Sequence, residues 1–184
     1  MNTSENIPSA SPYRRGADRG YILGLWFTAI FLSWIFSAQV PLLSLVAVAL
    51  IAGTPFLIYK LLRKSCLADP GVQVSALWVE GISMVFCGSL ICAVAVIVYF
   101  KWIDPGYMAR QLQTLVDVYA STGDESLAEA ARLSKAILDN NAVPPASTWT
   151  LAMWLFTVSS GSLLSGLMAV LVKARGLRSR IMNK

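Results

Sequence analysis

The chain has 184 residues, of which 56% are hydrophobic and 14% charged, with a formal net charge of +5. Soluble domains carry about 25% charged residues, so the composition argues against a soluble domain and favours one that faces lipid. The absence of histidine removes the commonest general base and metal ligand. The three cysteines (Cys66, Cys87 and Cys92) form no CxxC pair. We therefore expect no catalytic site, metal site or cofactor.

The first 19 residues are polar and include Pro8 and Pro12, which predicts a disordered tail ending in the basic residues Arg14, Arg15 and Arg19. The first apolar run covers 21–38. Its end, Phe36-Ser37-Ala38, has a bulky residue where a signal-peptide cleavage site needs a small one, and another apolar run follows at once. We therefore interpret it as an uncleaved first span.

Three more apolar runs cover 40–59, 77–100 and 149–172, and about 20 residues are needed to cross a bilayer core. The first two runs are nearly contiguous, which predicts a tight antiparallel hairpin, and Pro55 predicts a kink in the second. The expected fold is an all-α membrane protein in which residues 20–175 form a four-helix membrane domain. A basic tail, 176–184, follows it.

The segment 101–148 lies between the third and fourth spans and has the pattern of two amphipathic helices. The first helix presents one apolar face, formed by Met108, Leu112, Leu115, Val116 and Tyr119. Thr122 and Glu125 fit a capping box that begins the second helix. We expect a helical hairpin whose apolar faces bury each other, lie on the bilayer or recruit a partner protein.

The basic residues predict the orientation. Eleven of the fifteen Lys and Arg side chains fall in the N-terminal tail, the loop after the second span and the C-terminal tail. Segment 101–148 holds four basic and six acidic residues. Because cytoplasmic segments near spans are enriched in Lys and Arg, both termini are expected in the cytoplasm and the hairpin outside it.

Glu80 is the only acidic residue near the interior of a span. In one interpretation it lies at the inner interface beside Trp78, where it reaches water, Lys60 or Arg63. In the other it carries protons in transport, because buried carboxyls in membranes are often functional. Small residues also recur every fourth position, at Gly20 and Gly24 and at Gly161 and Ser165. They predict close helix packing, within one chain or between copies.

The exit of the third span reads Tyr99-Phe100-Lys101-Trp102-Ile103-Asp104-Pro105-Gly106-Tyr107-Met108. This aromatic pair and Ile-Asp-Pro step, together with the Gly20-to-Gly24 spacing, resemble a four-span bacterial membrane family, domain of unknown function 4199. The resemblance implies the same architecture and a place in the bacterial cytoplasmic (inner) membrane. It implies no activity.

These features favour a non-enzymatic scaffold or regulatory protein that binds a partner at the hairpin or at the basic tails. The alternative is a small oligomeric transporter that uses Glu80. The expected partners are the lipid bilayer and either another protein or further copies of the chain, and no nucleic acid.

Overall fold

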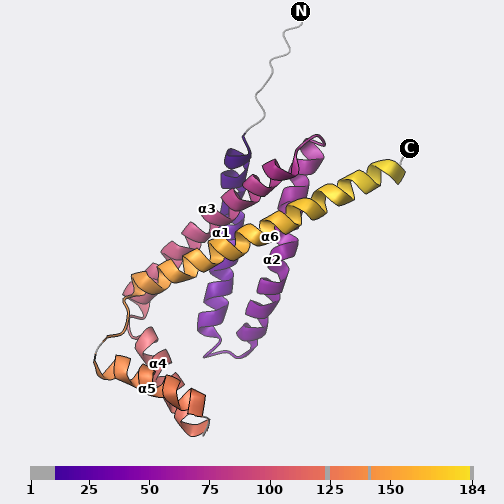
Figure 1. Ribbon diagram of the computed structural model, residues 1–184. Helices are drawn as coiled ribbons and strands as arrows, with labels where there is room; N and C mark the ends of the chain where they lie inside the picture. The colour runs from indigo at the N-terminus through magenta and orange to yellow at the C-terminus, as the bar shows by residue number, and fades with distance from the viewer. Residues whose placement is uncertain (1–10, 123–124, 141, 183–184) are drawn as a thin grey trace, which may run out of the picture. The chain divides into compact units, whose positions relative to one another are not determined.

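The computed structural model describes residues 11–122, 125–140 and 142–182. These residues form α1 (Pro12–Phe36), α2 (Leu42–Ala68), α3 (Val74–Val98), the π-helical segment η1 (Tyr99–Ile103), α4 (Tyr107–Thr122), α5 (Glu125–Asp139) and α6 (Ala146–Met182). Figure 1 shows this succession along the chain.

Among the described residues, four helical segments are long and apolar enough to cross a membrane: Pro12–Phe36, Leu42–Ala68, Val74–Ile103 and Ala146–Gly176. Many of their large apolar side chains are exposed, as expected where lipid replaces water as the solvent. The predicted fold class, an all-α protein with four spans, is confirmed.

The first helix begins at Pro12, so the prediction of a disordered tail is wrong for residues 12–19, while residues 1–10 lie outside the described part. Ser11 is the N-cap, and its hydroxyl accepts a hydrogen bond from the backbone N–H of Arg14 at 3.4 Å. A serine cap followed by proline at the first helical position is a strong start signal. The polar composition of the segment masked this signal.

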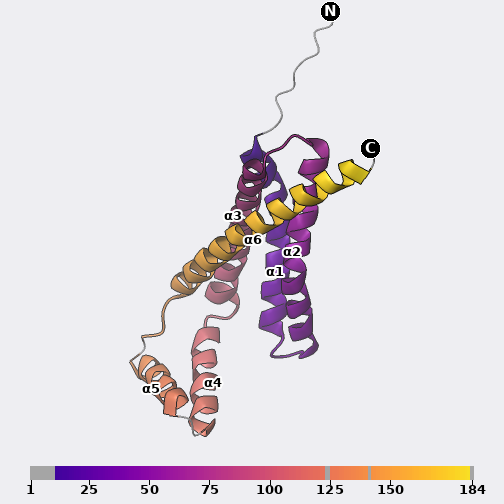
Figure 2. The same cartoon turned by 45° about the vertical axis from the view of Figure 1, so that its right-hand side comes forward.

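The chain divides into two compact units, 1–93 with 154–184 and 94–153. In the first unit, the start of α1, the α2–α3 connection and the end of α6 lie at the same end (Figures 1 and 2). We call this the terminal end. A cluster of buried apolar side chains forms the core of this unit and includes Leu23, Ile58, Leu61, Leu62, Leu77, Met84, Val85, Met168, Ala169 and Val172.

In the second unit, α4 and α5 pack against each other, which confirms the predicted helical hairpin. Of the predicted partner face, Met108, Leu112 and Tyr119 are half-buried and Leu115 is exposed.

Asp104, which precedes α4, forms an ion pair with Arg110 in the first turns of that helix. Burial, together with the nearby Tyr99 and the charge of Asp104, raises the pKa of Tyr107. The predicted capping box of Thr122 and Glu125 depends on side chains that the structure does not describe.

Candidate functional site

Glu80 lies near the start of α3 and is fully buried. Its carboxylate accepts hydrogen bonds from Arg19 Nη1 at 2.6 Å, from Ser65 Oγ at 2.6 Å and from Arg15 Nε at 3.3 Å. The expectation that Glu80 reaches water, Lys60 or Arg63 is therefore wrong. The ion cluster instead joins α3 to α1 and α2.

Arg19 makes the larger share of these contacts. Besides binding Glu80, its Nη1 donates to the Leu61 carbonyl at 3.0 Å and to Ser65 Oγ at 2.5 Å. Arg15 is bound through a single, longer hydrogen bond. Both arginine side chains keep about a quarter of their surface exposed, at 21% and 25%. Burial of a carboxylate is costly unless it is paired and hydrogen-bonded, and this arrangement meets both conditions.

Glycines of α1 bring its backbone against α3 beside this cluster. A Cβ atom on Gly16 would lie 2.5 Å from the Glu80 carbonyl oxygen, and one on Gly20 would lie 2.7 Å from the Cys87 Cβ. A Cβ on Gly24 would lie 2.8 Å from the Ile91 Cβ. No larger residue fits these positions without moving a helix, so the glycine spacing sets the depth at which Arg15 and Arg19 reach Glu80.

A second side of α3 packs against α6 in the same way. A Cβ on Gly81 would lie 2.6 Å from the Ser165 Cβ, and one on Gly161 would lie 2.5 Å from Val85. The small-residue stripe of the fourth span is thus used for packing within the chain. Ser165 Oγ is buried and has no hydrogen-bond partner among the described residues.

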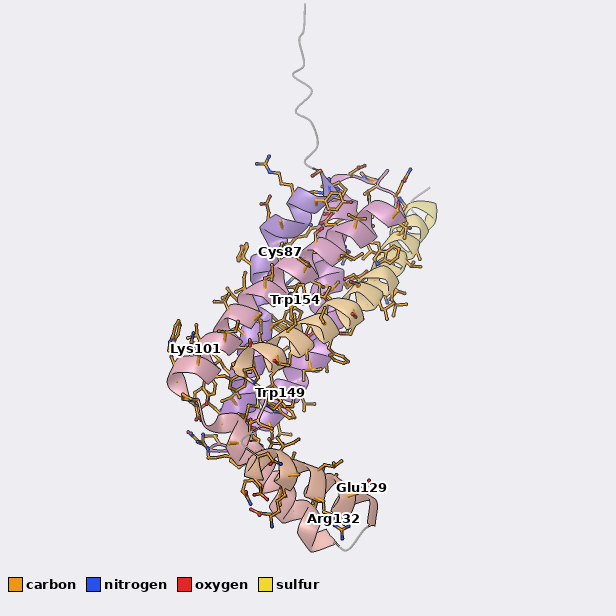
Figure 3. All side chains as sticks on the ribbon, turned by 60° about the vertical axis from the view of Figure 1, so that its left-hand side comes forward. Cys87, Lys101, Glu129, Arg132, Trp149 and Trp154 are labelled. Carbon is orange, nitrogen blue, oxygen red and sulfur yellow. The ribbon has the colours of Figure 1, made fainter. Side chains whose placement is uncertain are left out.

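Aromatic side chains extend the contact between α3 and α6. Trp78 Nε1 donates to the Ser162 carbonyl at 3.0 Å. Further along, Trp154, which is labelled in Figure 3, belongs to this contact. Its ring packs edge-on against that of Phe86, with ring centroids 5.4 Å apart. Thus α3 contacts both α1 and α6.

Sequence reasoning singled out Glu80 but not Arg15, Arg19 or Ser65 as its partners. The available signal was the four-residue glycine spacing, which begins at Gly16, before the first apolar run. Residues four positions apart lie on the same face only in a helix, so this spacing predicts that the helix already includes Gly16. Arg15 and Arg19 then lie on that helix, one turn apart.

The four spans and their buried ion cluster define an α-helical multi-pass membrane protein. The chain belongs to a family described as proteins of unknown function, DUF4199, whose sequence profile matches residues 19–174. This confirms the resemblance seen at the exit of the third span. Comparisons with curated proteins and with solved structures give no match.

Proposed function

We propose that this protein is a non-enzymatic scaffold of the bacterial cytoplasmic membrane that binds a protein partner through the α4–α5 hairpin. The observation that carries the proposal is that the hairpin belongs to a compact unit with its own helix packing. It also leaves Leu115 and Leu133 exposed by 40% and 63%. Exposed apolar side chains that group together are typical of a contact surface, and we take these two leucines as its apolar part.

The proposed orientation has both termini in the cytoplasm and the hairpin on the other side. It is supported by the charges at the terminal end of the first unit. There the described residues 11–93 and 154–176 include eight basic side chains and three acidic ones, of which Glu80 is buried. Basic residues flanking spans favour the cytoplasmic side.

The alternative, an oligomeric transporter that uses Glu80, is less favoured by the geometry. A proton carrier must exchange its proton with water on each side of the membrane. The Glu80 carboxylate is buried and accepts hydrogen bonds from two arginines and a serine, which suits a fixed structural role.

Site-specific photo-crosslinking in cells tests the scaffold. A photoreactive amino acid at Leu115 or Leu133 is expected to give a discrete adduct, and the exposed Gln113 and Arg132 on the same helices are control positions. The variant Leu115→Asp, probed from Leu133, should give a weaker adduct than the unsubstituted hairpin. An adduct of twice the protein's mass would identify a second copy as the partner. Equal adducts at all four positions, or none, would contradict the proposal.

A further inference from the structure

The last part of α2 carries three cations on its exposed surface: Lys60, Arg63 and Lys64. Glu80, the buried carboxylate that sequence reasoning placed near them, is bound by Arg15 and Arg19 instead. Within the described residues no ion pair joins any of the three to a carboxylate, and α2 itself contains no Asp or Glu. None of the three charges is therefore paired with a carboxylate of the described residues.

A fourth cation comes from α6. Arg175 lies over the ring of Tyr59, 5.5 Å from its centroid, and Tyr59 and Arg63 are one helical turn apart on α2. The two helices are close here, because a Cβ on Gly176 would lie 3.5 Å from Cys66 Sγ. Figures 1 and 2 both show α6 passing the end of α2. Lys173 is engaged differently, since its Nζ donates to the carbonyls of Pro70 and Val72.

The same face of α2 continues into the apolar part of the span. Helical spacing aligns Lys60 and Arg63 with Phe56, which is 70% exposed, and with Val48 and Leu45 further along the helix. At 1.5 Å per residue, Phe56 lies about 6 Å along the helix axis from Lys60. The face thus passes from aliphatic to aromatic to cationic, the order of acyl chain, interface and headgroup in a phospholipid leaflet.

We propose that Lys60, Arg63, Lys64 and Arg175 form a headgroup site for an anionic phospholipid. The guanidinium groups bind phosphate oxygens through paired N–H donors, and the lysines add point charges. The acyl chains lie along Phe56, Val48 and Leu45. This apolar track selects a membrane lipid over a free phosphate ion. The inference does not depend on the partner proposed for the hairpin.

Native mass spectrometry of the full-length protein in mild detergent tests the site, with phosphatidylglycerol, phosphatidylcholine and inorganic phosphate as probes. We expect phosphatidylglycerol to bind about tenfold or more tightly than phosphatidylcholine, because basic residues near a membrane surface attract anionic lipid. The variant Lys60→Gln/Arg63→Gln/Lys64→Gln should reduce that preference to about twofold or less. Added salt should weaken binding to the wild type.

The matched control is Lys101→Gln/Arg132→Gln/Lys135→Gln, which removes three exposed cations from the second unit. It should keep the wild-type preference. An equal loss in both triple variants, or a full preference in the α2 variant, would overturn the proposal. Inorganic phosphate binding as tightly as phosphatidylglycerol would also overturn it. If the α2 triple variant does not fold, the single variants Lys60→Gln and Arg63→Gln provide the same comparison. Each should reduce the preference for phosphatidylglycerol over phosphatidylcholine about threefold.

Discussion

At the residue scale, Glu80 is the side chain at which we expect a small substitution to reduce the stability of the protein most. The substitution Glu80→Gln would keep its shape but leave Arg15 and Arg19 without a counter-charge beside a buried amide. Removing one partner of a buried ion pair costs about 3 kcal/mol or more, so we expect a loss of about that size. Unfolding in mixed detergent micelles measures it, with Arg63→Gln as the exposed, unpaired control. A stability equal to that of the wild type would contradict the structural role of Glu80.

The two arginines of the cluster should differ in importance. Arg19 contacts Glu80, Ser65 and the Leu61 carbonyl, while Arg15 makes one longer hydrogen bond. We expect Arg19→Gln to cost about 2 kcal/mol and Arg15→Gln about 1 kcal/mol or less. The same unfolding assay compares them. A larger loss for Arg15 would show that the hydrogen-bond geometry does not set the energetics of the cluster.

At the element scale, the contact of α1 with α3 depends on glycine. A methyl group at Gly16 would strike the Glu80 backbone, which a side-chain rotation cannot relieve. We expect Gly16→Ala to destabilise the protein by about 1–3 kcal/mol, the usual range for overpacking. Gly176→Ala on α6 is the control, because its nearest neighbour lies at an ordinary contact distance of 3.5 Å. Denaturation of both variants side by side measures the difference, and equal stabilities would mean that α1 can shift freely.

The sequence alone predicted the four apolar spans, the all-α fold and the α4–α5 hairpin. Each of these depends on local hydropathy and on the periodicity of apolar residues. Helix ends were harder. The extension of α1 back to Pro12 depends on a cap and on packing against α3, and neither raises the hydropathy of residues 12–19. The partners of Glu80 were missed for the same reason. Lys60 and Arg63 are closer to Glu80 along the chain than Arg15 and Arg19 are. The glycine contact between α1 and α3 nevertheless brings the two arginines closer to Glu80 in space.

At the scale of the whole molecule, one end of the first unit combines the ion cluster, most of the buried apolar cluster and the cations of α2 and α6. All four spanning helices begin or finish there. Such an end anchors the spans at one membrane surface, because long basic side chains keep their charges in the headgroup layer while their stems stay apolar. The elements between α3 and α6 form a unit of their own.

The proposed orientation makes a prediction for the intact protein in its membrane. A protease site inserted after Asp124, between α4 and α5, should be cut when protease is added outside spheroplasts. A tag placed after Lys184 should survive, because the basic residues that flank the spans favour the cytoplasmic side. Permeabilised cells, in which both sites must be cut, provide the control. Loss of the C-terminal tag with an intact hairpin site would invert the orientation. The hairpin would then face the cytoplasm, and its proposed partner would have to be sought there.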